Sequence, residues 1–420
     1  MKQATLIFII VATILANLNV ITFADTQLPT PPKVTADSAV LMDATTGQIL
    51  YSKNMDAAYP PASTTKMMTA LLTLENCKLD DVVTIGNDFT QQNYKLLDGN
   101  SISIKDGEQI TVKDLLHAMI MFSANDAAVA LAVHISGSVP AFAALMNKRA
   151  AELGCTSSHF ANPNGLYDPN HKVSGKDMAL ILRELLKHPE FSQIATTIHY
   201  TLSPTNKTDA ADTIKERSLY NEDKMIYKNR PEYYEGIVGG KTGYTIQSLF
   251  SYVACANRNN HTLIVTLIHN PEKDYYDEAK SLFDYGFMNY DLVKLYSKGQ
   301  KVSSYSPKKG VSIPLTASED VYYELPKGST EKPQVSIDKK NIPISALKKG
   351  KEVLNATLTF NNQKLETFGL ICGTTYVPNT IKSSSINYNI IILIIALILI
   401  GVVLFFITNF RKRKKLKGIY

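Results

Sequence analysis

The apolar run Ile390–Ile407 constrains the architecture of this chain more than any other feature. It holds 18 residues without a charge, and no polar face repeats along it. As a helix it would be about 27 Å long at 1.5 Å per residue, close to the ~30 Å of a hydrocarbon layer. The basic stretch Arg411–Lys417 follows at once, which favours a cytoplasmic C-terminus. We predict a transmembrane helix over 390–407 and a basic cytoplasmic tail over 408–420, with a buried core helix as the alternative.

A shorter apolar run, Leu6–Leu15, lies at the other end of the chain. It follows Lys2 and leads to Thr22-Phe23-Ala24, a small-x-small cleavage pattern. We predict a secretory signal peptide over 1–24; an uncleaved anchor would usually carry a longer run. With the N-terminus exported, everything from Asp25 to the apolar run near the C-terminus would lie outside the membrane of the cell.

The net charge of +6 gives no support for a nucleic-acid partner. The chain has 44 lysines and arginines against 38 acidic residues, and six of the basic residues lie in the last ten positions. The remainder is neutral, with 38 of each sign. A nucleic-acid-binding protein needs a basic face on its folded part, so we expect no nucleic acid.

Cysteine and histidine spacing point to no metal or cofactor site. The eight histidines form no ligand cluster in the sequence, and the cysteines show no Cys-x-x-Cys pair. We expect no metal and no cofactor, and we expect buried free thiols at Cys77, Cys155, Cys255 and Cys372.

A chain of 420 residues is too long for one ordinary core. Residues 25–35 are proline-rich and are predicted to form an extended linker. From about Asp291 the helical periodicity stops, and short apolar runs are separated by Lys, Ser, Pro and Gly. We predict a main domain over 36–289, a small β-rich domain over 291–380 and a polar stalk over 381–389.

Hydrophobic periodicity predicts the main elements. Ser38–Asp43 and Gln48–Tyr51 flank a glycine turn and predict a hairpin. Helices are predicted at Met67–Leu74, Leu115–Met121 (capped by Thr111 with Asp114), Asn125–Ile135, Pro140–Leu153 and Lys176–Lys187. Strands are predicted at Gly236–Gly243, Leu249–Ala256 and Thr262–Ile268, the last two joined by a five-residue loop over 257–261, and in the β-rich domain at Val311–Leu315, Val321–Leu325, Val335–Ile337 and Val353–Thr359.

Ser63-Thr64-Thr65-Lys66 is the first segment whose side chains could take part in catalysis. If Ser63 opens the helix that continues through Leu74, Ser63 and Lys66 share one face of it. A serine hydroxyl needs a base to take its proton, and a lysine can serve only if burial or a second cation keeps it neutral. An isolated Ser-x-x-Lys is more often a capping serine beside a solvated lysine.

Two further segments follow in order. Ser123-Ala124-Asn125 is predicted to place a hydroxyl and an amide on a tight loop between helices, although an ordinary turn with a capping residue has the same pattern. Lys241-Thr242-Gly243 lies on a predicted strand, where a lysine and a hydroxyl can hold a carboxylate and Gly243 admits a substrate backbone; a charged edge strand is the alternative. Ser123 stands 60 residues after Ser63, and Lys241 stands 118 after Ser123. No single match indicates a catalytic site, but three matches in this order together do.

With these motifs the chain resembles the serine-type D-alanyl-D-alanine carboxypeptidases, the low-molecular-mass penicillin-binding proteins. Gly47–Asn54, Pro61–Lys66 and Asn162–Asp168 match the family pattern, and the resemblance covers roughly Val40–Asn289. It implies an α/β (α+β) fold like that of serine transpeptidases and β-lactamases, with an antiparallel sheet and a helical subdomain, followed by the small all-β domain and the C-terminal helix.

The resemblance also implies roles, residue by residue. Ser63 would be the acylated nucleophile and Lys66 its base, Ser123 would pass a proton to the leaving D-alanine, and Asn125 would contact the substrate backbone. Lys241 and Thr242 would hold the terminal carboxylate beside Gly243, and the backbone N–H groups of Ser63 and Tyr244 would form the oxyanion hole. The partners implied are the stem pentapeptide of peptidoglycan as substrate and β-lactams as inhibitors.

The chain departs from the family pattern at two places. Ser248-Leu249 stands where Ala-Gly is usual, and a leucine there could narrow the cleft or shift the strand. Val238-Gly239-Gly240 precedes Lys241, where Asp-Gly and a larger apolar residue are common.

Two alternatives to the carboxypeptidase follow from the sequence. One is a catalytically weak wall-binding or scaffolding protein, which the first departure and the β-rich domain suggest. The other is a β-lactamase, whose Glu-x-x-Leu-Asn element has its nearest counterpart in Glu216–Tyr220, without the final Asn.

Overall fold

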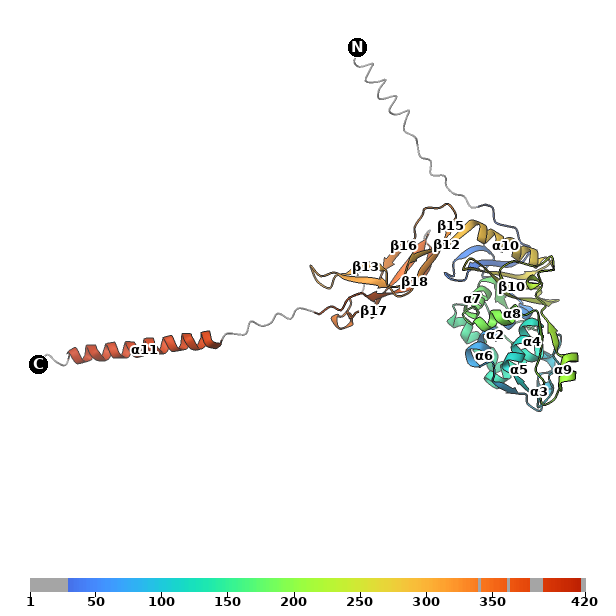
Figure 1. Cartoon of the computed structure of the whole chain (residues 1–420), viewed down its shortest axis with the longest axis horizontal. Coiled ribbons are helices and arrows are strands. Elements are labelled where there is room, and N and C mark those ends of the chain that lie inside the picture. The colour runs from blue at the N-terminus through green and yellow to red at the C-terminus, as the bar shows by residue number, and fades with distance from the viewer. Residues whose placement is uncertain (1–28, 339–340, 361–362, 378–387, 417–420) are drawn as a thin grey trace, which may run out of the picture. The chain divides into compact units, whose positions relative to one another are not determined.

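The structure is a computed structural model that describes residues 29–338, 341–360, 363–377 and 388–416 (Figure 1). The predicted signal peptide lies outside the described residues, as does most of the predicted stalk. The described residues form two compact units. The first takes in the chain up to Gln300 together with Ala317–Asp338 and Asn355–Gly369, and the second takes in the remainder.

A five-stranded antiparallel sheet organises the first unit, in the order β2-β1-β11-β10-β9. The predicted hairpin at the start of the chain is confirmed as β1 and β2, and the three later strands are confirmed as β9, β10 and β11. Their bounds are Ser38–Asp43 (β1), Ile49–Lys53 (β2), Ile237–Thr245 (β9), Leu249–Arg258 (β10) and His261–Asn270 (β11). β9, which carries Lys241-Thr242-Gly243, is the last strand at one edge of the sheet. Among the described residues no further strand pairs with its outer edge.

Both faces of the sheet are buried, each in its own hydrophobic cluster. Alternate residues of β1 face opposite ways, so Val40 and Met42 join the larger cluster and Ala39 and Leu41 the smaller one. The larger cluster packs against the helical subdomain, and the smaller one packs against α10 (Tyr275–Asn289). Figure 1 shows α10 on one side of the sheet and the helical subdomain on the other.

The five predicted helices of the first unit are confirmed, whereas four further α-helices among its described residues were not predicted. The Thr111 side chain accepts from Asp114 N at 3.1 Å, which confirms the predicted cap. Ser138 and Ser174 cap α6 and α7 in the same way. The bounds are Ala62–Thr65 (the 3₁₀ turn η1), Lys66–Asn76 (α2), Phe89–Asn93 (α3), Tyr94–Leu96 (η2), Val112–Met121 (α4), Asn125–Ser136 (α5), Val139–Glu152 (α6), Gly175–Leu185 (α7), Pro189–Ala195 (α8), Ala210–Glu216 (α9) and Lys224–Ile226 (η3).

Three short two-stranded sheets also lie in this unit, and periodicity missed them because none of their strands exceeds three residues. They pair Ala58–Tyr59 (β3) with Val173–Ser174 (β6), Val82–Thr84 (β4) with Gln109–Thr111 (β5), and His199–Thr201 (β7) with Ser218–Tyr220 (β8).

The predicted five-residue loop between β10 and β11 is wrong. Arg258 pairs with His261, so only Asn259 and Asn260 make the turn. Both have positive φ, 54° and 63°. Asparagine tolerates the left-handed region better than most residues, and a two-residue turn with two such angles matches the twist of the strands it joins.

The departure at Ser248-Leu249 does not shift the strand. Leu249 pairs with Thr245, and the register then continues without a break to Cys255 opposite Gly239. Leu249 has φ 51°, a left-handed conformation that costs a leucine roughly 1–2 kcal/mol and that glycine adopts freely. This explains in physical terms why the family places glycine here.

The described residues between Tyr290 and Cys372 are rich in strands, as predicted. Three of the four predicted runs lie within strands, the fourth, Val311–Leu315, enters its strand only at Ile313, and three further strands were missed. β12 pairs with β15, and the other five strands are ordered β13-β14-β18-β17-β16. Their bounds are Tyr290–Tyr296 (β12), Lys301–Tyr305 (β13), Ile313–Ala317 (β14), Val321–Pro326 (β15), Gln334–Ile337 (β16), Glu352–Phe360 (β17) and Gln363–Cys372 (β18), with the 3₁₀ turn Ile344–Ala346 (η4).

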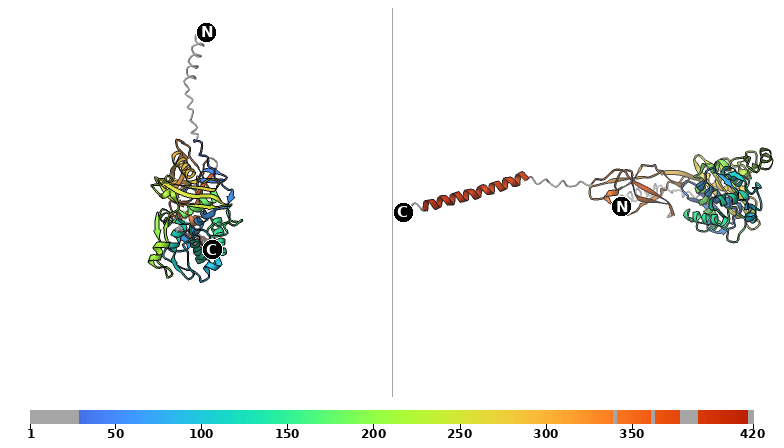
Figure 2. Two further views of the ribbon diagram at one scale, coloured as in Figure 1. Left: turned by 90° about the vertical axis from the view of Figure 1, so that its right-hand side faces the viewer. Right: turned by 90° about the horizontal axis from the view of Figure 1, so that it is seen from below.

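The C-terminal apolar run is a helix, as predicted. α11 covers Tyr388–Leu416, and its most apolar 18-residue window has a mean hydropathy of 3.7. Figure 2 shows α11 as one continuous helix, in red. Its apolar side chains are exposed rather than packed in a core, unlike those of a buried helix.

The four cysteines are free thiols, as expected. Cys155, Cys255 and Cys372 are buried, and Cys77 is half-buried.

The stability of this fold can be tested at a buried ion pair. Arg217 and Glu108 are both almost fully buried, 2.5 Å apart, and Arg217 also donates to the carbonyl oxygens of Ile102 and Ser103. Replacement of Arg217 by Met should lower the free energy of unfolding by about 3–5 kcal/mol, because it leaves a buried carboxylate without its partner. Urea denaturation of the purified protein, followed by circular dichroism, measures this change.

The matched control is Arg149→Met. Arg149 pairs with Glu75 and Glu184, but all three side chains are about one-fifth exposed. The expected loss is therefore below about 1 kcal/mol. Equal losses in the two variants would contradict the prediction.

Candidate active site

Ser63 lies in η1, directly before α2, and its position depends on a strained neighbour. Ala62 has φ 51°, which is uncommon for a residue with a side chain. Gly165 fits against this turn because it has no Cβ: a Cβ there would stand 1.7 Å from the Ala62 carbonyl oxygen. The segment Asn162–Asp168, matched in the sequence, therefore supports the turn that presents Ser63.

Lys66 is the first residue of α2, and its amine faces Ser63. Lys66 Nζ is 2.9 Å from Ser63 Oγ, 2.8 Å from Asn125 Oδ1 and 2.8 Å from the Asn164 carbonyl oxygen. The residue is 1% exposed. Burial holds the pKa of Lys66 well below its usual range, and the positive charge of Lys241 lowers it further.

Ser123 and Asn125 lie on the predicted loop between α4 and α5. Ser123 has φ 66°, which turns the chain sharply between the two helices. Asn125 N donates to the Asn100 carbonyl oxygen at 2.7 Å, and Asn125 Nδ2 donates to the carbonyl oxygen of Asp98. The backbone around Asp98 and Asn100 thus orients the amide that contacts Lys66.

Asp126 fixes that backbone segment, although no sequence motif pointed to it. Its carboxylate accepts from Ser101 Oγ at 2.6 Å and from the backbone N–H groups of Ile102 and Ile104. The side chain is buried at the start of α5, so its role is visible only once the helix and the loop are placed together.

Lys241 and Thr242 lie on the edge strand β9. Lys241 is 2% exposed and donates to the Thr242 carbonyl oxygen at 3.1 Å. Burial lowers the pKa of Lys241, while the carboxylates of Glu222 and Asp223 act in the opposite direction. The alternative of a charged edge residue in solvent therefore does not hold.

Two glycines of β9 allow other parts of the protein to lie very close to the strand. A Cβ on Gly243 would lie 2.9 Å from the Pro61 carbonyl oxygen and 3.0 Å from Ser63 N. Gly243 thus lets β9 lie against the Ser63 turn, a reason that the sequence analysis did not anticipate. Gly240, at the second departure, leaves room for Asp223 Oδ2 and Tyr252 OH, each 2.6 Å from where a Cβ would stand.

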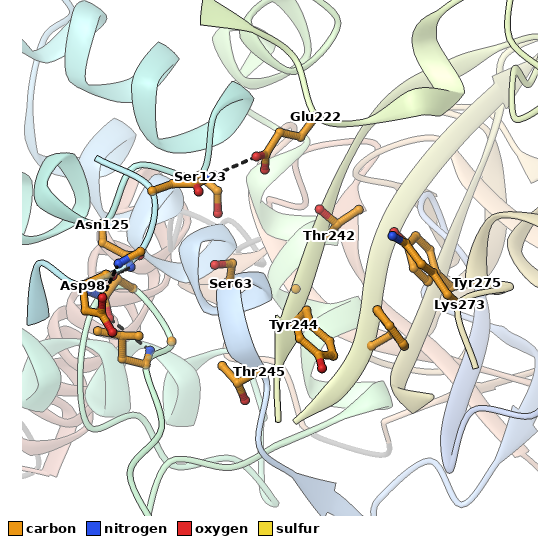
Figure 3. Close-up of a pocket in the computed structure, with 17 residues that line it drawn as sticks. Ser63, Asp98, Ser123, Asn125, Glu222, Thr242, Tyr244, Thr245, Lys273 and Tyr275 are labelled. Carbon is orange, nitrogen blue, oxygen red and sulfur yellow. Dashed lines mark hydrogen bonds between the residues drawn. The ribbon is translucent and has the colours of Figure 1, made fainter. Parts of the chain in front are cut away.

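These segments meet around a cleft of about 500 Å³ (Figure 3). Figure 3 shows Ser63 between the loop of Ser123 and Asn125 on one side and β9, with Thr242 and Tyr244, on the other. Lys66 and Lys241 do not line it. The lining residues are Ser63, Asp98, Gly99, Asn100, Ser123, Asn125, Asn164, Gly165, Leu166, Glu222, Thr242, Gly243, Tyr244, Thr245, Phe250, Lys273 and Tyr275.

Leu249 is not among the described residues that line the cleft, so the expectation that it narrows the cleft is wrong. The charged residues Asp98, Glu222 and Lys273 line it without having been predicted. They lie outside the three motifs, on segments with no motif of their own. Asn164 could have been found, because it lies within the matched Asn162–Asp168 segment.

Comparison with known proteins identifies the family of this chain. The family model "D-alanyl-D-alanine carboxypeptidase" matches residues 25–271, and the model "Penicillin-binding protein 5, C-terminal domain" matches residues 290–377. The chain belongs to the D-alanyl-D-alanine carboxypeptidase family. It is a serine-type carboxypeptidase of the penicillin-binding protein 5 type, which confirms the family, fold class and enzyme class predicted from the motifs.

Individual relatives cover most of the chain. It is 34% identical to the D-alanyl-D-alanine carboxypeptidase DacF of Bacillus subtilis, over 70% of this chain and 73% of that protein. It is 31% identical to DacA of Haemophilus influenzae, over 79% and 86%. Penicillin-binding protein 5 from Haemophilus influenzae has a similar solved structure, with a TM-score of 0.68, 30% identity, and coverage of 83% of this chain and 99% of that one.

The electrostatics of this carboxypeptidase's cleft predict a measurable coupling. Lys241→Met removes the charge that lowers the pKa of Lys66, so the pKa of Lys66 should rise. NMR titration of ¹³C-labelled lysine side chains measures it, with the Lys66 signal assigned by its loss in Lys66→Arg. Lys241→Arg keeps the charge and should leave the titration unchanged. An unchanged pKa in Lys241→Met would contradict the coupling.

Proposed function

We propose that this carboxypeptidase cleaves the terminal D-alanine from peptidoglycan stem peptides through an acyl-enzyme on Ser63. The observation that carries the proposal is the 2.9 Å contact between Ser63 Oγ and a buried Lys66 amine. With its pKa held low, the amine is neutral for a larger share of the time, and its lone pair can take the serine proton.

The first step forms the bond between Ser63 Oγ and the carbonyl carbon of the penultimate D-alanine. The serine proton passes to Lys66 Nζ, which keeps its contacts with Asn125 Oδ1 and the Asn164 carbonyl oxygen. The backbone N–H groups of Ser63 and Tyr244 stabilise the oxyanion that forms. Both residues line the cleft.

The second half of the step breaks the peptide bond to the terminal D-alanine. The leaving nitrogen needs a proton, and Ser123 lines the cleft where its hydroxyl can pass one from Lys66. Asn125 contacts the substrate backbone, while Lys241 and Thr242 attract the terminal carboxylate. Water then attacks the ester, releases the shortened peptide and restores the Ser63 hydroxyl. A β-lactam would acylate the same hydroxyl and act as an inhibitor.

The intact contacts around Lys66 favour this enzyme over a catalytically weak scaffold. The scaffold hypothesis rested on Ser248-Leu249, and neither the β9–β10 register nor the cleft lining is altered there. Of the Glu216–Tyr220 segment, on which a β-lactamase would depend, Arg217 is buried in its pair with Glu108.

We also propose that α11 spans the cell membrane once, with the catalytic domain outside the cytoplasm. Its candidate spanning segment, Asn389–Lys412, would be about 36 Å long, enough to cross the ~30 Å hydrocarbon layer. The basic tail that follows favours the cytoplasmic side, where anionic lipids attract cations.

Ser63→Ala should abolish the penicilloyl adduct and lower D-alanine release by about a thousandfold or more, because no other group supplies the nucleophile. Intact-mass spectrometry after incubation with penicillin, and release of D-alanine from a pentapeptide ending in D-Ala-D-Ala, measure the two effects. The chain offers a matched control in Ser306→Ala, since Ser306 and Lys309 repeat the Ser-x-x-Lys spacing on a segment outside any helix. An adduct on Ser63→Ala, or its loss in Ser306→Ala, would contradict the assignment.

The proposed topology predicts protease protection of the C-terminus. An epitope tag added after Tyr420 should survive protease treatment of intact spheroplasts and be digested only after the membrane is permeabilised. The catalytic domain should be digested in both cases. A tag that is digested in intact spheroplasts would rule out the cytoplasmic tail.

A further inference from the structure

A cluster of three ionisable side chains lies outside the cleft. Asp43 ends β1, His261 begins β11 and Glu324 lies on β15, all within the first compact unit. Each offers one ligand atom, and these atoms lie within 4.8 Å of one another. His261 Nε2 is 3.6 Å from Asp43 Oδ2 and 2.7 Å from Glu324 Oε1.

The cluster buries two acidic side chains whose ligand atoms lack hydrogen-bond partners among the described residues. The side chains of Asp43 and Glu324 are 0% exposed, and that of His261 is 12% exposed. Asp43 Oδ2, both Glu324 carboxylate oxygens and His261 Nε2 have no partner with hydrogen-bond geometry among the described residues. Arg183, whose charge also acts on Asp43, donates to the carbonyl oxygens of Ala44 and Thr45. Two buried carboxylates with these free lone pairs are costly unless a cation joins them.

Neighbouring groups hold the ligand atoms in place. Asp43 Oδ1 accepts from Thr46 N at 2.6 Å and from Thr46 Oγ1 at 2.7 Å, which leaves Oδ2 directed at the cluster. Gln48 bonds the backbone of Glu324 on both sides, donating to its carbonyl oxygen and accepting from its N–H. Phe287 packs edge-on against the His261 ring at 5.4 Å. Such outer contacts are what orient the ligands of metal sites.

We propose that Asp43, His261 and Glu324 bind one divalent transition-metal ion of the zinc class. One imidazole nitrogen with two carboxylates suits zinc, whereas magnesium and calcium prefer sets of oxygen ligands alone. The ion would neutralise both carboxylates and leave the imidazole uncharged. A water would be the fourth ligand of a tetrahedral ion.

A small rearrangement is needed to admit the ion. Ligand atoms around a tetrahedral zinc lie about 3.3 Å apart, given zinc–ligand distances of roughly 2.0–2.1 Å. The 3.6 Å separation between His261 and Asp43 already suits this, and the Glu324 carboxylate must withdraw by about half an ångström from His261. The site would tie β15 to the ends of β1 and β11. Because none of its residues lines the cleft, its role would be structural.

Zinc binding to the purified, untagged full-length protein in detergent tests the proposal. After removal of metals, equilibrium dialysis against zinc chloride and elemental analysis should find about one zinc per chain, and zinc should raise Tm by several degrees. Glu324→Gln and His261→Gln should each weaken zinc binding at least tenfold and abolish the shift in Tm. Carboxypeptidase activity at a temperature well below Tm should not depend on zinc.

The matched control is His269→Gln. His269 Nδ1 is 2.6 Å from Asp37 Oδ2, so it forms a histidine–carboxylate pair that belongs to no such cluster. This variant should bind zinc as the unaltered protein does. Absence of bound zinc in the unaltered protein, or its retention in both Glu324→Gln and His261→Gln, would overturn the proposal. If no zinc binds and Glu324→Gln changes only the pH dependence of Tm, the two acids share a proton instead, which also overturns it.

Discussion

The contacts of the Lys66 amine are the interaction on which the rest of the site depends. Three acceptors from three separate parts of the chain converge on one nitrogen: Ser63 on η1, Asn125 on α5 and Asn164 on a loop. A lysine has three hydrogens when charged and two when neutral. The neutral amine can therefore keep Asn125 and Asn164 as acceptors while its lone pair faces Ser63. The same contacts that position this proposed base would leave its lone pair free to receive a proton.

Burial sets the chemistry of these groups as well as their positions. Lys66 and Lys241 are both almost fully buried, and each disfavours the charge of the other. A substrate carboxylate beside Lys241 would offset the positive charge of that lysine. Because this charge lowers the pKa of Lys66, substrate binding would also change the pKa of Lys66. Ser63 lines the cleft, whereas Lys66 and Lys241 do not.

Several left-handed backbone positions show how packing imposes conformations that local preference opposes. Ala62, Ser123 and Leu249 all have positive φ without being glycine, and all lie beside the cleft or on the strand next to it. Such strain persists where surrounding contacts determine the backbone, and it is common at functional sites. At Ala62 the supporting contact is Gly165, which approaches so closely that a Cβ would not fit.

The sequence by itself determined the order of elements, the helical and strand periods, the apolar C-terminal helix and the three motifs. It could do so because these depend on local spacing and on the facing of neighbouring side chains. The short two-stranded sheets and the role of Asp126 were not predicted, because both depend on partners distant in the chain. The spacing Ser-x-x-Lys also occurs at Ser306, yet Lys309 is exposed. Only the tertiary structure decided which serine faces a buried lysine, because it alone removes water from the amine and brings Asn125, Asn164 and Lys241 around it.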